Sequence, residues 1–207
     1  MIIRQNHCRI AGILLTLSLA HSWAAAHVGV AAIRTEHTEV SLLNEQQQIR
    51  PGRPFWVALQ LKPESGWHTY WKNPGDAGKA TTIKWNLPPG WKASPLYWPY
   101  PKRIRTGSLV SFGYTDTVSL LTEISANMAP PGTRKIEISA TADWLVCKEI
   151  CIPENATFRL SLSLGQEAVP DPETASVFKG TRALLPRNVS WTARYLYEGS
   201  RLVFDAP

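Results

Sequence analysis

Two cysteines, Cys147 and Cys151, are the residues of this chain whose type and spacing point most directly to chemistry. The third cysteine, Cys8, lies near the amino terminus. Extended residues four positions apart lie roughly 13 Å from each other, whereas a disulfide needs Cα atoms within about 7 Å. A disulfide here therefore requires the chain to bend between the two cysteines. A strand that leads into a turn, ended with the help of Pro153, would provide this bend.

A bridge between these cysteines would add little as a structural staple. A five-residue loop gives roughly 2 kcal/mol on the chain-entropy model, against about 4.7 kcal/mol for a hundred-residue loop. Small strained bridges tend to be labile or catalytic. The spacing therefore favours a redox-active dithiol, with a structural bridge as the first alternative.

A metal site is the second alternative. Two thiolates suit Cu(I), and His68 or Met128 would complete the coordination. The histidines beyond the first 26 residues (His27, His37 and His68) show no ligand spacing. We therefore predict no metal and no other cofactor.

Residues 1–26 have the pattern of an export signal. Arg4 and Arg9 accompany an apolar run at residues 10–20, and three alanines at 24–26 supply a cleavage pattern. Cleavage after Ala26 would remove Cys8 and place the remaining chain where disulfides form.

The charge pattern argues against a nucleic-acid partner. The formal net charge is +6 over 207 residues, and removal of the signal leaves about +4. The Lys and Arg residues are scattered, whereas nucleic-acid binding demands a basic stripe. After the signal, no apolar run is long enough to cross a membrane.

Alternation of apolar and polar residues predicts an all-β fold. It runs through residues 55–61, 83–87, 118–124, 136–144 and 158–164, with a shift at Leu121. Pro/Gly turns separate these runs, and no stretch favours a long amphipathic helix. We expect an immunoglobulin-like β-sandwich without the inter-sheet disulfide of antibody domains.

The alternation also suggests how the chain is divided. Residues 27–168 are predicted to form the sandwich, and Pro170-Asp171-Pro172-Glu173 resembles a linker. Two further strands, at 189–197 and 201–204, are predicted to meet at Glu198-Gly199-Ser200. Residues 169–207 therefore comprise a linker and the truncated start of a second β domain, or a tail that packs on the first.

Aromatic residues gather in two clusters, at 67–71 and 97–101. Aromatic residues in proline-flanked loops are expected near the surface. An exposed aromatic cluster on a sandwich favours a further alternative, a non-enzymatic module that binds a carbohydrate or a protein and keeps a structural disulfide.

Several separated motifs resemble the periplasmic N-terminal domain of the DsbD family, and its ScsB-type branch in particular. The resemblance covers about residues 30–165. It rests on residues 67–78 (WHTYWKNPGDAG), 85–91 (WNLPPGW), Trp98-Pro99, Gly113-Tyr114 and 142–154 (ADWLVCKEICIPE).

The resemblance implies a function. The family is a membrane-embedded thiol reductase, in which a thioredoxin-like domain reduces the N-terminal domain, which then reduces periplasmic partners. Cys147 and Cys151 would be the exchanging pair, with Cys151 attacking first and Cys147 resolving. The expected partners are thioredoxin-like proteins and a membrane-embedded electron donor. Because the ScsB-type branch is associated with copper tolerance, a copper(I)-binding role stays an alternative.

The resemblance also implies an aromatic cap over the cysteines. Tyr97 and Trp98 would form it, with Tyr70 and Trp71 as further partner contacts; the alternative is ordinary packing in the sandwich.

Acidic residues precede the cap aromatics in the best-studied branch, but Ser94-Pro95-Leu96 stands there in this chain. Asp143 and Glu149, or Asp76, are left as candidates for proton handling. The charges next to the two cysteines are mixed. Lys148 would favour the thiolate of Cys147, whereas Asp143 and Glu149 would oppose it.

Overall fold

The predicted alternation of apolar and polar residues corresponds to two β-sheets that face each other. The computed structural model describes residues 32–187, 194–198 and 201–205, so the expected export signal lies outside the described residues. The first sheet contains, in spatial order, β1 (Ile33–Arg34), β2 (Thr38–Asn44), β4 (Phe55–Pro63), β10 (Val118–Ser125) and β7 (Lys92–Ala93). Its strands pair antiparallel.

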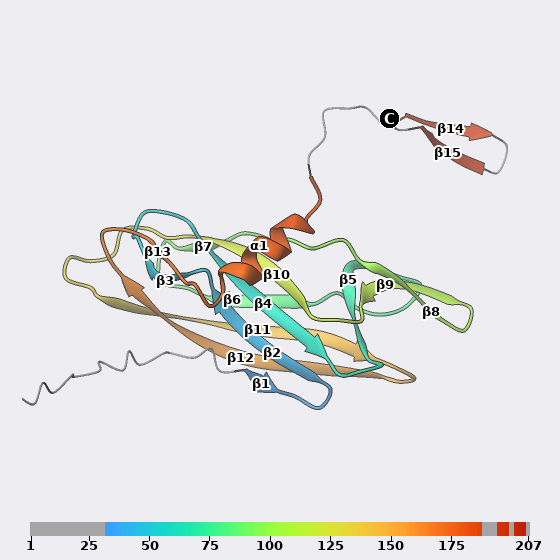
Figure 1. Cartoon of the computed structure of the whole chain (residues 1–207), viewed down its shortest axis with the longest axis horizontal. Coiled ribbons are helices and arrows are strands. Elements are labelled where there is room, and N and C mark those ends of the chain that lie inside the picture. The colour runs from blue at the N-terminus through green and yellow to red at the C-terminus, as the bar shows by residue number, and fades with distance from the viewer. Residues whose placement is uncertain (1–31, 188–193, 199–200, 206–207) are drawn as a thin grey trace, which may run out of the picture.

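The second sheet carries the two longest strands, β11 (Lys135–Cys147) and β12 (Cys151–Leu164), which form one hairpin (Figure 1). Its spatial order is β13 (Val169–Pro170), β3 (Gln46–Ile49), β12, β11, β5 (His68–Gly75), β9 (Leu109–Tyr114) and β8 (Lys102–Thr106). β6 (Thr82–Asn86) pairs with β11 further along, where β5 has left it. The fold is the predicted immunoglobulin-like sandwich, and every predicted run of alternation down to residue 164 corresponds to a strand, with Leu87 one residue beyond the end of β6.

The main core lies between the sheets. On β12, Ala156, Phe158 and Leu162 are buried and Leu160 packs on the same core, while Thr157, Arg159 and Ser161 face outward. They meet inward side chains of β4 and β10 such as Leu59 and Leu120, each at most 1% exposed. Each such side chain contributes about 1.5–3 kcal/mol on burial.

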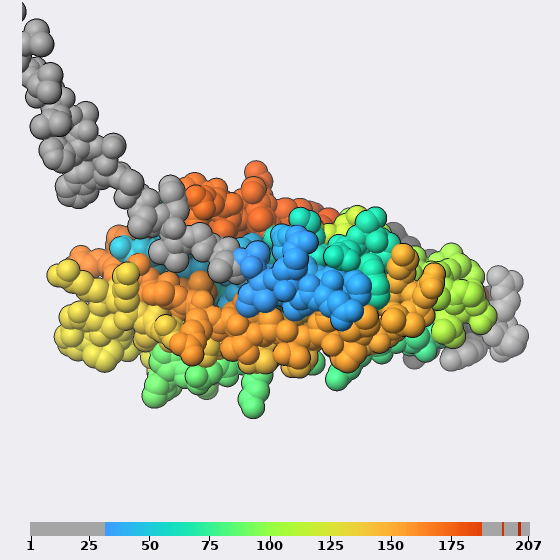
Figure 2. All heavy atoms as spheres, turned by 90° about the horizontal axis from the view of Figure 1, so that it is seen from below, coloured from blue at the N-terminus to red at the C-terminus, as the bar shows by residue number. Residues whose placement is uncertain are grey.

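The end of the sandwich near the cysteines is closed by a buried carboxylate. Glu154 accepts hydrogen bonds from the Thr35 hydroxyl (2.7 Å), the His37 backbone N–H (2.7 Å) and the Trp144 indole N–H (3.0 Å). These bonds fasten the β1–β2 turn to β12. Figure 2 shows the blue atoms of β1 and β2 lying beside the orange atoms of β12.

A second, smaller core lies on the outer face of the first sheet. Phe178 of α1 (Ala175–Ala183) is 0% exposed and packs with Leu43, Ala58 and Leu121. Figure 1 shows α1 lying over β10. Because α1 covers this face, Leu120 and Leu121 are both buried although they point to opposite sides of β10. The shift in the alternation at Leu121 has this cause.

The segment that leads into α1 is fastened to the sandwich. The Asp171 backbone N–H donates to the Glu45 carbonyl (2.9 Å), and the Thr174 hydroxyl donates to the Asn44 carbonyl (2.7 Å). The sequence predicted a linker here and did not predict a helix.

The predicted C-terminal hairpin is present as β14 (Arg194–Glu198) and β15 (Arg201–Asp205), which pair antiparallel. Residues 188–193 and 199–200 of the predicted strands and turn lie outside the described residues. The assignment of this hairpin to a second domain stays a prediction. Within the described part of the chain, no helix has the length and apolar character needed to cross a bilayer.

Candidate functional site

The two cysteines lie at the hairpin turn of the two longest strands. β11 ends at Cys147 and β12 begins at Cys151, and the two residues are direct cross-strand partners. Their Cα atoms are 4.1 Å apart and a disulfide joins them. The Lys148 backbone N–H donates to the Ile150 carbonyl (3.0 Å) and closes the turn. The predicted bend is therefore present.

We expected Pro153 to help end a strand, but it does not. It lies inside β12, opposite Leu145 of β11. The neighbour of β12 on its other side, β3, pairs only with Ser163 and Leu164. Proline is tolerated at Pro153 because this end of β12 is a sheet edge, where a backbone N–H has no strand to donate to.

The disulfide is on the outer face of its sheet and not in the core. Side chains alternate along β11, and Trp144 and Val146 point into the main core. Cys147 therefore points outward, together with the half-buried Leu145. An outward disulfide is available to a partner without opening the sandwich.

The two cysteines differ in exposure. Cys147 is only 2% exposed, whereas Cys151 is exposed to solvent. The cause is the arrangement of strands: β5 pairs with β11 so that the buried His68 lies directly opposite Cys147, while Cys151 lies at the edge of the sheet. Thiol exchange needs an approach to sulfur, and this site leaves Cys151 open to it.

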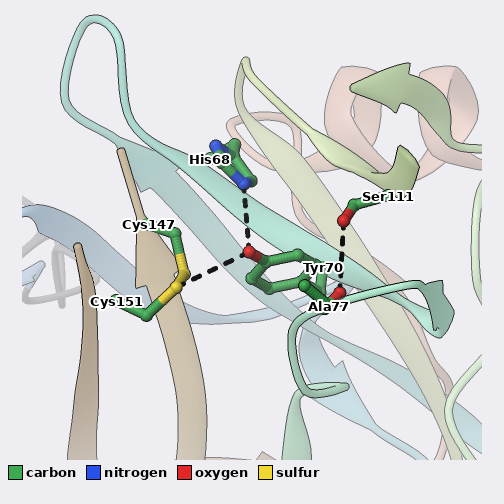
Figure 3. Close-up of a disulfide and its surroundings, with 6 residues drawn as sticks. All are labelled: His68, Tyr70, Ala77, Ser111, Cys147 and Cys151. Carbon is green, nitrogen blue, oxygen red and sulfur yellow. Dashed lines mark hydrogen bonds between the residues drawn. A yellow bond between two sulfur atoms is a disulfide. The ribbon is translucent and has the colours of Figure 1, made fainter. Parts of the chain in front are cut away.

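Tyr70 of β5 touches the exposed cysteine. Its hydroxyl oxygen lies 3.7 Å from Cys151 Sγ and 3.2 Å from His68 Nε2 (Figure 3). Tyr70 is 3% exposed, and its burial raises the pKa of the hydroxyl. Burial also lowers the pKa of His68. At neutral pH the site therefore holds a protonated phenol and an uncharged imidazole.

The Tyr70 ring is held in place by the loop at residues 76–81. A Cβ atom at Gly78 would come within 2.2–2.5 Å of three ring atoms, so the glycine backbone lies directly on the ring. On the other side of the strand, Tyr70 is paired with Gly113. A Cβ atom at Gly113 would come within 2.0 Å of the Thr69 carbonyl oxygen, so Gly113 makes room for the backbone of β5, whereas Gly78 makes room for the phenol.

The loop is fastened to β9. The Asp76 backbone N–H donates to the Val110 carbonyl (3.0 Å), and the Val110 backbone N–H donates to the Asp76 carboxylate (2.8 Å). The Ser111 hydroxyl donates to the Ala77 carbonyl (3.2 Å), which is visible in Figure 3. Asp76, a candidate for proton handling, thus anchors the loop.

We expect Gly78→Ala to destabilise the protein by about 2–4 kcal/mol and to displace Tyr70. The left-handed backbone (φ +103°) costs about 1 kcal/mol for a residue with a Cβ, and the overlap with the ring adds about 1–3 kcal/mol. Urea unfolding measures the loss. Gly107→Ala is the matched control, because Gly107 also has a positive φ (+61°) but no atom within 4 Å of its Cβ position. Equal losses in the two variants would contradict the contact with Tyr70.

The other three aromatic candidates lie elsewhere. Trp71 packs against the main core, with the Lys72 ammonium 5.3 Å from its ring. Tyr97 exchanges backbone hydrogen bonds with Leu121 in the first sheet and packs edge-on against Trp56. Trp98 packs on the main core. Of the four residues predicted as cap or partner contacts, the structure brings Tyr70 to the cysteines.

The two carboxylates predicted for proton handling are both exposed. Glu149 lies in the turn between the cysteines, and Asp143 lies on the outer face of β11 opposite Asn155. Among the described residues, no cluster of three or more His, Cys, Asp or Glu side chains forms a metal site. His68, considered for Cu(I), directs its Nε2 to Tyr70.

The pairing between β5 and β11, which brings His68 to Cys147, was not predicted from the sequence. Strand alternation alone puts His68 and Tyr70 on one face. It does not reveal that His68 is opposite Cys147, because the register between strands far apart in sequence depends on the packing of the whole sheet.

The sequence of this chain matches one family model. The family model of the N-terminal part of the thiol:disulfide interchange protein DsbD matches residues 39–163. No protein of curated function matches the chain.

Two N-terminal domains are among the solved structures that are similar to the chain. The N-terminal periplasmic domain of ScsB from Proteus mirabilis aligns with a TM-score of 0.60 at 18% identity, over 85% of this chain. The chain spans 66% of that domain, just under two thirds. The N-terminal domain of Neisseria meningitidis DsbD in the reduced form aligns with a TM-score of 0.36 at 12% identity, over 63% of this chain and 89% of that one. The ScsB structure supports the fold, and the family model spans more than half of the sequence. This chain therefore belongs to the DsbD N-terminal domain family, whose members act in thiol:disulfide interchange.

Proposed function

We propose that this chain is a periplasmic thiol:disulfide interchange domain that passes electrons through Cys147 and Cys151 from a thioredoxin-like donor to partner proteins. The observation that carries the proposal is the unequal exposure of two bonded cysteines, with Cys147 2% exposed and Cys151 open at a sheet edge. A bridge that served only to hold the hairpin would gain nothing from an open sulfur.

The reaction has two halves, each of which moves two electrons. In the first, a thiolate of the donor attacks Cys151 Sγ, the Cys147–Cys151 bond breaks, and the Cys147 sulfur takes up a proton. A second donor thiolate then attacks the donor sulfur of the mixed disulfide, which releases Cys151 as a thiolate and leaves the donor oxidised.

In the second half, the Cys151 thiolate attacks a disulfide of the partner and displaces one partner sulfur as a thiolate. Cys147 then gives up its proton to the displaced partner thiolate, and the resulting Cys147 thiolate attacks Cys151 Sγ and releases the other partner sulfur. The Cys147–Cys151 bond forms again, and the partner is reduced. Cys151 makes the mixed disulfide in both halves, which agrees with the first-attack role that the family resemblance implied.

The surface around Cys151 suits a protein partner. Ile150, in the turn next to Cys151, is 65% exposed, and its neighbours Lys148 and Glu149 are also exposed. A partner that docks to reach Cys151 would cover the Ile150 side chain. The proposed partners are therefore proteins that present a cysteine pair. A membrane-embedded electron donor and an export signal at residues 1–26 belong to the same proposal.

The proposal is tested by incubating the oxidised chain with a reduced thioredoxin-like protein and measuring free thiols on both proteins over time. We expect two thiols to appear on Cys147 and Cys151 for each donor disulfide formed. The double variant Cys147→Ala/Cys151→Ala is the control. A reduction potential below about −300 mV together with no exchange would show that the bridge is structural.

A further inference from the structure

The polar atoms Cys151 Sγ, Tyr70 hydroxyl and His68 Nε2 lie in a row that allows two arrangements of protons (Figure 3). A phenol has one proton to donate. It lies 3.2 Å from an imidazole nitrogen and 3.7 Å from a sulfur, and both accept hydrogen bonds. The proton therefore points to one of the two neighbours at a time.

The redox state of Cys151 decides which neighbour receives the proton. A disulfide sulfur carries no hydrogen and is a weak acceptor, so the hydroxyl is free to donate to a deprotonated His68 Nε2. A thiolate is charged, and hydrogen bonds to charged acceptors are roughly twice as strong as neutral ones. After reduction the hydroxyl proton is expected to turn to Cys151 Sγ. His68 then serves Tyr70 only as a donor, through Nε2–H, and a neutral imidazole reaches that state by a change of tautomer.

We propose that the Tyr70 hydroxyl donates a hydrogen bond to the Cys151 thiolate in the reduced protein, and that His68 holds this hydroxyl in place by donating from Nε2. Tyr70 contacts the reacting sulfur and is a catalytic residue in this scheme, whereas His68 acts through Tyr70 and is a positioning residue. The inference rests on the proposed function and adds the group that prepares Cys151 for attack.

Because they are buried, Tyr70 and His68 are better placed to stabilise the Cys151 thiolate than the carboxylates predicted from the sequence, Asp143 and Glu149. Tyr70 is 3% exposed and His68 is 7% exposed, so water competes little for their hydrogen bonds. The charged groups near this end of the sheet are exposed: Lys148 and Glu149 in the turn, and Lys79 and Asp143 beside a small hollow lined by Leu145 and Pro153. Solvent screens their effect on the thiolate.

The test measures how the reactivity of Cys151 depends on pH. In the Cys147→Ala background, the rate at which iodoacetamide labels the Cys151 peptide follows the thiolate population. We expect Tyr70→Phe to raise the midpoint of this profile by about one pH unit, because the thiolate loses a donor. Below both midpoints the rate then falls about tenfold. Phenylalanine keeps the ring that packs under Gly78, and circular dichroism verifies the fold.

Two variants of His68 separate positioning from packing. His68→Gln keeps an N–H donor and is expected to leave the midpoint within a few tenths of a pH unit of the parent, whereas His68→Leu removes the donor and raises the midpoint in the same direction as Tyr70→Phe. An unchanged midpoint in Tyr70→Phe overturns the inference, and equal midpoints in the two His68 variants overturn the role of His68. Labelling needs no partner protein, so it fails or succeeds independently of the exchange assay that tests the proposed function.

Discussion

Replacing Cys151 with alanine is expected to abolish exchange with protein disulfides, whereas replacing Cys147 is expected to stop the reaction after its first step. Both variants lose the same disulfide, and both remove one sulfur from the same turn. A structural bridge would therefore respond equally to the two changes. An exchange site with one open cysteine would not.

The physical reason for the difference is access. A partner sulfur must approach within bonding distance of the attacked sulfur, and Cys147, beside the neighbouring strand β5, is only 2% exposed. In Cys151→Ala the remaining thiol is covered, so neither the donor nor a partner disulfide reaches it. In Cys147→Ala the open thiol of Cys151 still attacks, but no second sulfur of the chain is present to release the partner.

The measurement is the formation of covalent adducts after mixing each reduced variant with a partner that carries a disulfide, followed by electrophoresis without reductant. Cys147→Ala should accumulate a stable adduct that dithiothreitol removes. Cys151→Ala should give no adduct under the same conditions. Adducts of equal amount in the two variants would contradict the assignment of Cys151 as the attacking residue, and more adduct with Cys151→Ala would reverse it.

The part of the site that could be predicted from the sequence is the hairpin that carries Cys147 and Cys151. The spacing of Cys147 and Cys151 required a turn, and the alternation before and after it placed that turn between two strands. Both features are local, because a hairpin sets its own register through the length of its loop. The separated motifs then added the family, through resemblance rather than through spacing.

What surrounds the disulfide depends on contacts that are far apart in the sequence. The expectation that Tyr97 and Trp98 approach the cysteines followed the order of motifs along the chain. The backbone of Tyr97 instead pairs with Leu121 in the first sheet. His68 reaches Cys147 because β5 is inserted beside β11, and β5 then departs to pair with β9. No local pattern encodes that pairing.

Helix α1 was missed for a different reason, which is the weakness of its local signals. It has nine residues, no side-chain hydrogen bond at its amino-terminal cap and no acidic residue in its first turn. Short helices are marginal in water, and their stability comes mainly from tertiary packing. The sequence signal for α1 lay instead in β10, the strand on which the helix packs. Two successive leucines there, Leu120 and Leu121, point to opposite faces, and both are buried, so both faces of the strand must be covered.

Replacing Phe178 with alanine is therefore expected to lower the free energy of unfolding by about 3–5 kcal/mol, the usual cost of removing a fully buried phenylalanine. Phe178 is 0% exposed and fills the space above Leu43, Ala58 and Leu121. Its loss leaves a cavity under α1 and uncovers one face of the first sheet. The helix would then be held to the sandwich mainly by Arg182. The guanidinium of this exposed residue pairs with Glu45 and lies 5.3 Å from the ring of Trp56. Exposed ion pairs contribute less than about 1 kcal/mol, so they do not compensate.

Urea unfolding of Phe178→Ala measures this loss, and Lys179→Ala is the matched control, because Lys179 is the next residue of the same helix and is exposed. The control is expected to change the free energy by less than about 0.5 kcal/mol. A large loss in Phe178→Ala within a single transition would mean that α1 folds together with the sandwich. The segment after residue 169 would then be a part of the sandwich domain at least as far as α1, and a second domain would begin beyond it. A loss in Phe178→Ala as small as that of the control would instead mean that α1 is an independent attachment and that the sandwich is complete without it.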